Sequence, residues 1–212
     1  MFAERSTEFE IDVDTSSYRL ATRFSKFHNL PELTSLLSSI ADFHQVDTLA
    51  GIPQIDGYTD ALISKTNDFA DYLKDISQRA ENVRKGYVSR KDDNMLKITT
   101  DGRKAALDLR LVDPSAMFTY QSKVARCVEN VADIYFKTTV RKSAQIIFCD
   151  TSTPKTGFNI YDEVKTMLQS KGVPSDKIAF IHDARTEAQR NTMFAQVRKG
   201  GIRVLLGSTF KL

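Results

Sequence analysis

The sequence predicts a mixed α/β chain, with a mostly helical region over residues 1–120 and a parallel α/β layer over residues 121–212. Three short apolar runs of strand length carry this prediction, because a helix-like segment separates each run from the next. Strand–helix–strand–helix–strand order favours parallel strands joined by right-handed crossovers. The earlier part of the chain instead places its apolar residues mainly at helical spacing.

The first part of the chain predicts one weak, short strand and two helices. Residues Phe9–Val13 alternate apolar and polar side chains, which is the period of a strand. A helix is expected after Pro31, because proline suits the first helical position and leucines then recur at helical spacing. Residues 51–57 contain glycines and a proline and are expected to form a loop. A longer helix with one narrow apolar stripe is expected over Asp60–Lys85.

The middle of the chain predicts two further helices. The stretch Lys97–Pro114 is ambiguous, since its leucines fit a strand as well as a helix. We favour a helix that Asp101 caps and that Asp113-Pro114 ends, because the residue before proline rarely stays helical. From Ser122 onward, valines recur at helical spacing and define a second helix.

The three predicted strands lie in the last part of the chain, at Ala144–Cys149, Lys177–His182 and Ile202–Gly207. The first two are continuous apolar runs, typical of strands buried on both faces of a parallel sheet. The helix between them is expected to stop at Gly172. The helix before the third strand is expected to open with a capping box that starts at Thr186.

Composition excludes several classes of function. Net charge is +3, and 41% of residues are hydrophobic, so the chain is expected to fold and is only mildly basic. No P-loop, G-x-S-x-G or H-E-x-x-H motif is present. Neither the cysteines (Cys127, Cys149) nor the histidines (His28, His44, His182) have metal-ligand spacing, so no metal site is expected. The sequence shows no signal peptide or membrane span, which predicts a cytoplasmic protein without membrane contacts.

Polar side chains follow each predicted strand, where parallel sheets usually collect ligands. The candidate nucleic-acid-binding residues are Asp150, Thr151, His182, Asp183, Ser208, Thr209 and Lys211. Hydroxyls, backbone N–H groups and a lysine suit the phosphate oxygens of a nucleotide or a nucleic-acid backbone. The alternative is that these residues are ordinary polar loops of an α/β fold.

Individual residues also have two interpretations. His182 could be a general base or a loop histidine bonded to backbone, and no nucleophile is evident beside it in the sequence. Cys149 could be a reactive thiol or a small buried hydrophobe. The pairs Lys123/Arg126 and Arg141/Lys142 could track phosphates or be solvated surface.

Several segments resemble the second RecA-like lobe of superfamily-two helicases of the Swi/Snf-like branch. Ser122-Lys123 resembles the start of the first helix of that lobe, and Gln145–Pro154 resembles motif IV. Arg190–Phe194 has the form R-x-x-x-F, and Arg203–Lys211 is similar to the start of motif V. Three longer stretches (YRLATRFSKFHNLPEL, NMLKITTDGRKAALD and FNIYDEVKTMLQSKG) resemble large helicase-like proteins of phages and conjugative elements, which are often joined to a DNA methyltransferase region.

This resemblance implies a partial RecA-like three-layer lobe, cut off within motif V, preceded by a connector between the two helicase lobes. The family's phosphate cradle, metal-binding acidic motif and arginine finger have no counterpart here, and ATP hydrolysis needs all three. The chain is therefore expected to have no catalytic residue and no cofactor of its own, with ATP and Mg belonging to an intact parent. The implied partners are DNA, the first RecA-like lobe and, through an uncovered sheet edge, a second copy of the chain.

Two other classes of function fit the sequence. One is a non-enzymatic protein-interaction module that uses the helical first part as its docking surface. The other is a small α/β protein that binds a nucleotide or a phosphorylated metabolite, although G-x-G-x-x-G is absent.

Overall fold

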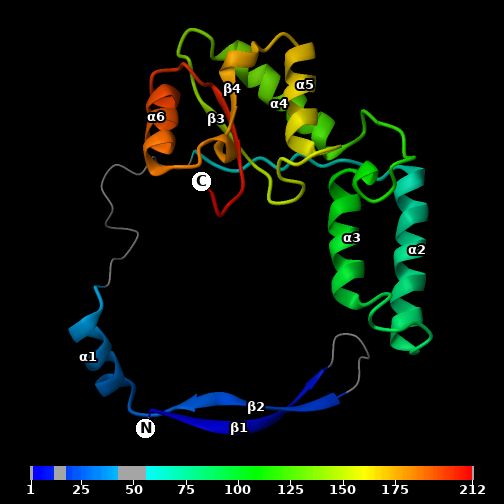
Figure 1. The fold of residues 1–212 in the computed structure, drawn as a ribbon, viewed down its shortest axis with the longest axis vertical. Coiled ribbons are helices and arrows are strands. Elements are labelled where there is room, and N and C mark those ends of the chain that lie inside the picture. The colour runs from blue at the N-terminus through cyan, green and yellow to red at the C-terminus, as the bar shows by residue number, and fades with distance from the viewer. Residues whose placement is uncertain (1, 12–17, 43–55, 212) are drawn as a thin grey trace. The chain divides into compact units, whose positions relative to one another are not determined.

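The computed structural model describes residues 2–11, 18–42 and 56–211, and the chain divides into two compact units (Figure 1). The first unit comprises Met1–Asp60 with Glu81–Met95, and the second comprises Ala61–Ala80 with Leu96–Leu212. Helices and a small three-stranded parallel sheet make the chain mixed α/β, as the sequence predicted. No helix in the described ranges is both long enough and apolar enough to span a bilayer.

The first unit contains a β-hairpin that the sequence did not predict. Strands β1 (Ala3–Ile11) and β2 (Tyr18–Phe27) pair antiparallel, with a register shift between Glu4 and Arg5. The expectation that strands before residue 120 are short is wrong, since these strands have 9 and 10 residues. The alternation at Phe9–Val13 marked part of β1, but the pairing with β2 is a contact between strands that local periodicity does not reveal.

Helix α1 (Leu30–Ile40) follows the hairpin and confirms the helix predicted after Pro31. Pro31 lies in its first turn, where a missing backbone N–H costs nothing. None of its side chains is buried. The loop predicted over residues 51–57 lies largely outside the described residues, as does the end of the strand predicted at Phe9–Val13.

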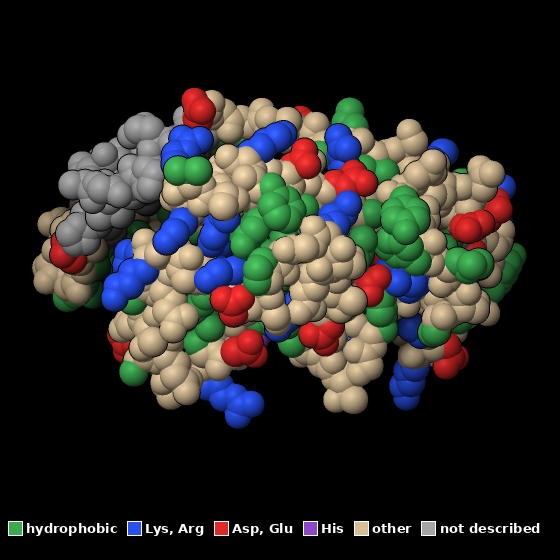
Figure 2. Space-filling view, turned by 90° about the horizontal axis from the view of Figure 1, so that it is seen from above, with side chains coloured by type: hydrophobic (Ala, Val, Ile, Leu, Met, Phe, Trp, Pro, Cys, Tyr) green, Lys and Arg blue, Asp and Glu red, His purple; other side chains and the backbone are tan. Residues whose placement is uncertain are grey.

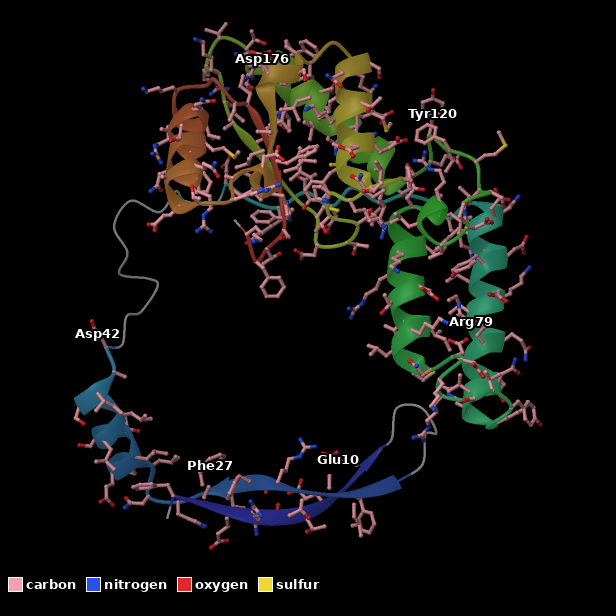
Figure 3. All side chains as sticks on the ribbon, in the orientation of Figure 1. Glu10, Phe27, Asp42, Arg79, Tyr120 and Asp176 are labelled. Carbon is pink, nitrogen blue, oxygen red and sulfur yellow. The ribbon has the colours of Figure 1, made fainter. Side chains whose placement is uncertain are left out.

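Helices α2 (Asn67–Arg84) and α3 (Met95–Leu107) confirm the helices expected over Asp60–Lys85 and Lys97–Pro114, with corrected boundaries. The first begins later than Asp60 because the Thr66 hydroxyl accepts from the backbone N–H of Phe69 and caps the helix there. Asp101 does not cap α3 but lies within it, where it pairs at 3.0 Å with Arg79 of α2, the residue labelled in Figure 3. The helix runs on to Leu107 and the 3₁₀ turn Leu109–Leu111 follows, so the prediction that Asp113-Pro114 ends the helix is also wrong.

The sheet of the second unit is parallel, as predicted. Strands β3 (Gln145–Phe148), β4 (Ile178–Phe180) and β5 (Val204–Gly207) are arranged in the order β3-β5-β4. The last strand in sequence is therefore the central one, and all four of its residues are buried.

Three helices flank this sheet. Helices α4 (Lys123–Lys137) and α5 (Ile160–Ser170) pack on one face and form the main core with β5, whereas α6 (Glu187–Arg198) lies on the other side (Figure 1). Ser122 caps α4, and Thr186 and Gln189 form the predicted capping box of α6. No residue of α6 is fully buried, so the sheet is covered much better by α4 and α5 than by α6.

Two strand predictions need correction. The run at Ala144–Cys149 was expected to be buried on both faces, but β3 is an edge strand and Ile146 and Phe148 are 52% and 61% exposed. An apolar run alone cannot distinguish an edge strand from a central one. The run at Lys177–His182 ends earlier than predicted, because residues Ile181–Asp183 form a 3₁₀ turn closed by the bond from Ala184 N–H to the Ile181 carbonyl.

Candidate nucleic-acid interface

The carboxyl ends of β3 and β5 are joined by one side chain. The carboxylate of Asp150, just after β3, accepts from the backbone N–H of Thr209 at 2.7 Å and from the Thr209 hydroxyl at 2.8 Å. Both residues are exposed, so the pair lies at the surface of the sheet edge. We call this pair the Asp150–Thr209 latch. It holds the loop after β5 against the loop after β3, two segments that are far apart in sequence.

The loop after β3 is shaped by its own hydrogen bonds. The Cys149 thiol donates to the carbonyl of Thr151 at 3.0 Å, which turns the chain immediately after the strand. Ser152 has a positive φ of 61°, and its hydroxyl accepts from the backbone N–H of Ile160 at 3.1 Å. Thr151 therefore contributes through its backbone carbonyl to the shape of the loop.

His182 lies in the 3₁₀ turn after β4 and is half-buried. Its ring packs edge-on against Tyr161, with ring centroids 5.2 Å apart. Its Nδ1 atom is buried and has no hydrogen-bond partner. The sequence left open a general base or a loop histidine bonded to backbone, and among the described residues no backbone group bonds Nδ1.

Tyr161 is the residue that sequence reasoning missed at this edge. Its side chain is fully buried in α5, and its hydroxyl donates to the Cys149 carbonyl at 2.7 Å. Burial raises the pKa of the Tyr161 phenol far above its ordinary value, with smaller contributions from Cys149 and Asp150. Tyr161 therefore stays protonated and links the end of β3 to the turn that carries His182. Its helical spacing with the apolar residues of α5 indicated burial but not this bond.

The remaining predicted residues differ in exposure. Ser208 is buried, with 7% of its surface exposed, and its carbonyl accepts from the backbone N–H of Lys211 at 2.9 Å. Asp183 and Lys211 are exposed. The structure thus brings Asp150, Ser208, Thr209 and Lys211 to the adjoining ends of β3 and β5, while Asp183 lies beyond β4.

Charge at the surface is mixed. On the face drawn in Figure 2, Lys and Arg side chains are interspersed with Asp and Glu. Arg126, one of the candidate phosphate contacts, pairs with Glu129 at 3.4 Å. Lys123 begins α4, whereas Arg141 and Lys142 follow its end, so the two basic pairs lie at opposite ends of one helix and do not form one patch.

A second cluster, centred on Arg110, also escaped the sequence analysis. Its guanidinium pairs with Asp108 at 2.8 Å and with Glu163 of α5 at 2.9 Å. The same group lies over the rings of Phe118 and Phe158, at 5.0 and 4.5 Å from their centroids. Hydrogen bonding to Asp108 is the main reason that the pKa of Arg110 is raised, although partial burial opposes it. This cluster fixes the segment before α4 to the start of α5.

The two cysteines behave as buried apolar side chains. Both are free and half-buried, and both pack against the main core. Burial raises the pKa of the Cys127 thiol, and burial is also the main reason that the pKa of the Cys149 thiol is raised. Of the two interpretations of Cys149, these features favour the buried hydrophobe over the reactive thiol. Among residues 2–11, 18–42 and 56–211, no cluster of His, Cys, Asp and Glu side chains has the geometry to hold a metal ion.

No protein-family model matches this chain, and neither the curated proteins nor the solved structures contain a match.

Proposed function

We propose that this chain supplies contacts to a nucleic-acid backbone as part of an ATP-dependent DNA helicase or translocase, and that its sheet is part of a RecA-like lobe. The resemblance of its segments to Swi/Snf-like helicases motivates the proposal. The observation that carries it is the Asp150–Thr209 latch, which fixes an exposed loop that carries Lys211 at the carboxyl edge of a parallel sheet.

The residues have different roles in this proposal. Lys211 supplies a point charge to a phosphate, and Thr209 holds the loop that carries Lys211, because its N–H and hydroxyl both donate to Asp150. Asp150 is a positioning residue, because its carboxylate repels phosphate and its oxygens already accept from Thr209. Such a contact is independent of base sequence, as a translocating motor requires. ATP, Mg and the residues that hydrolyse ATP belong to the rest of the motor.

The salt dependence of DNA binding tests this proposal. Binding of the 212-residue chain to a fluorescent DNA oligonucleotide is measured by anisotropy over a range of salt concentrations. Replacing Lys211 with alanine should make the negative slope of log K against log salt shallower by about one unit, since one phosphate contact is lost. Thr209→Ala should weaken binding at every salt concentration without changing the slope.

Lys171→Ala is the matched control, because Lys171 is also exposed but lies at the carboxyl end of α5. It should retain the slope of the unaltered chain. If Lys211→Ala and Lys171→Ala behave alike, the assignment of the strand-end loop to the nucleic acid is wrong. ATP hydrolysis by the chain alone would contradict the proposed division of labour.

A non-enzymatic protein-interaction module is the second candidate function. The exposed apolar side chains of the first unit favour it, since soluble proteins rarely leave a large apolar surface uncovered. A chain that shows no salt-dependent DNA binding but associates through that surface would support this candidate.

A further inference from the structure

One face of the β1–β2 hairpin is apolar and exposed. The register places Phe9 opposite Leu20, Thr7 opposite Thr22, and Arg5 opposite Phe24. Because side chains alternate along a strand, these three pairs share one face. Phe27 lies on the same face opposite Ala3, because the register shift between Glu4 and Arg5 adds one residue to β2. Their large apolar side chains are strongly exposed: Phe9 75%, Leu20 66%, Phe24 51% and Phe27 57%. Figure 3 shows Phe27 projecting from the ribbon. We call this surface the hairpin face.

The opposite face of the hairpin is polar. Glu4 lies opposite Lys26 there, and Glu8 lies opposite Ala21. The hydroxyls of Ser6 and Ser25 contact each other, and the Ser6 hydroxyl donates to Glu8 at 3.0 Å. A ribbon that is polar on one side and apolar on the other is the pattern of a strand pair that is covered on one side only.

The hairpin face is as large as the exposed apolar patches that often have a function on monomeric proteins. A hairpin of two strands is marginal in water by itself and gains stability when its apolar face is covered. The four large side chains expose roughly 450 Å². Two such faces packed together would bury roughly 900 Å² in total, which is the size of a small, weak interface.

We propose that the hairpin face binds the same face of a second copy of this chain, so that two hairpins form a four-stranded sandwich with two-fold symmetry. This inference does not depend on the proposed DNA contacts. A two-fold interface requires a surface that complements itself, in which residue i meets residue j and residue j meets residue i.

The arrangement of side chains on the hairpin face satisfies that requirement. Its centre is the small polar pair Thr7 and Thr22, whose hydroxyl oxygens are 2.8 Å apart. A two-fold axis running across the strands at this pair places Leu20 opposite the partner's Phe24. It also places Phe9 opposite the partner's Arg5.

Arg5 suits this arrangement. Its guanidinium already lies 5.1 Å from the centroid of the Phe24 ring, and cations interact favourably with aromatic faces. The same axis keeps Arg5 away from the partner's Arg5, so no like charges meet. No acidic side chain of the described strands lies on the hairpin face, so a strongly basic partner would find nothing to pair with.

Sedimentation equilibrium of the full chain tests the proposal. The mass should rise with concentration from 23.9 kDa towards twice that value. The double variant Leu20→Thr/Phe24→Thr keeps residues suited to strands but removes two apolar contacts per copy. Its dimer dissociation constant should rise at least about 30-fold. The matched control Glu8→Thr/Lys26→Thr changes the polar face and should dimerise as the unaltered chain does. Far-UV circular dichroism confirms that all three proteins are folded.

Cross-linking tests the two-fold geometry. Thr7 lies next to the axis, so Thr7→Cys should cross-link between copies with a short bis-maleimide above the background of the unaltered chain. Glu8→Cys, on the polar face, should not. A mass of 23.9 kDa at every concentration would overturn the proposal, and the hairpin face would then be covered by another protein or by this chain itself. A dimer that survives Leu20→Thr/Phe24→Thr but dissociates with Phe148→Thr would also overturn it, and would assign self-association to the exposed side of β3.

Discussion

Arg203 is a buried arginine that contacts both the ring and the backbone carbonyl of Tyr135. Its guanidinium carbon lies 3.9 Å from the centroid of the Tyr135 ring, and Nη2 donates to the Tyr135 carbonyl at 2.7 Å. The same group donates to the Thr138 hydroxyl at 2.9 Å, and Nε donates to the Ser143 carbonyl at 3.3 Å. These acceptors lie at and beyond the end of α4, where carbonyls lack helical partners and the helix dipole favours a cation.

We expect Arg203→Ala to lower the free energy of unfolding by about 2–4 kcal/mol, because it removes the bonds to Tyr135, Thr138 and Ser143 together with the contact to the Tyr135 ring. Lysine should restore only part of this loss, since a single ammonium cannot reproduce the planar guanidinium. Urea denaturation provides the measurement. Arg198→Ala, at an exposed position of α6, is the control and should change stability by less than about 0.5 kcal/mol. Equal stability of the two alanine variants would contradict this account of Arg203.

The Arg110 cluster should depend on the shape of the guanidinium as well as on its charge. Arg110→Lys retains the charge but cannot bond Asp108 and Glu163 together while lying over two aromatic rings. We expect a loss of about 1–2 kcal/mol in the free energy of unfolding. Arg103→Lys, on the exposed side of α3, should leave the free energy of unfolding unchanged. If Arg110→Lys left the free energy of unfolding unchanged, charge alone would be enough to hold the segment before α4 to α5.

The Asp150–Thr209 latch should be visible in hydrogen exchange. Asp150→Ala removes the acceptor of the Thr209 amide, so that amide should exchange about tenfold faster, as expected for a lost bond to a charged group. Asp183→Ala removes an exposed carboxylate without a bond to this loop and provides the comparison. Unchanged exchange at Thr209 in Asp150→Ala would show that the backbone after β5 holds its conformation without the latch.

Stability should fall in alkaline solution. Burial raises the pKa of Cys127 and Cys149 above the ordinary thiol value of 9.0. A group with a raised pKa in the folded state stabilises the protein fully below its unfolded pKa, and that contribution is lost as pH rises through the folded pKa. The urea midpoint should therefore decline above about pH 9. Tyr161 adds to this decline above about pH 10.

Variants of the two cysteines separate these contributions. The double variant Cys127→Ala/Cys149→Ala should show a smaller decline of the urea midpoint between about pH 9 and 10 than the unaltered chain does. For each protein, the decline is measured from its own midpoint at about pH 8. A midpoint that is constant up to about pH 10 in the unaltered chain would refute the proposed role of buried thiols.

Local signals in the sequence located most elements of the second unit. The capping box at Thr186 and the cap at Ser122 are bonds between residues three apart, so their spacing can be read directly. The three apolar runs likewise located the strands and predicted their parallel direction. Strand order, however, depends on contacts between distant residues, so the exposed side of Phe148 could not be predicted.

The site was predictable only as a set of strand ends. The predicted strands showed that Asp150 and Thr209 each follow a strand. They did not show that the two residues bond each other, because that depends on which strands are neighbours in the sheet. Arg110 was missed for the same reason, since Phe158 and Glu163 are distant from it in sequence. In the hairpin, the pairing of Phe9 with Leu20 is a contact between strands, which the local alternation around Phe9 does not reveal.

The strand order β3-β5-β4 also determines when the sheet can form during synthesis. β3 and β4 do not pair with each other, and each has only β5 as its neighbour. As the chain leaves the ribosome, the first two strands must therefore wait, with their backbone groups solvated, until Val204–Gly207 has emerged. Helices α4, α5 and α6 can form earlier from local contacts, but the parallel sheet closes only after β5 has left the ribosome.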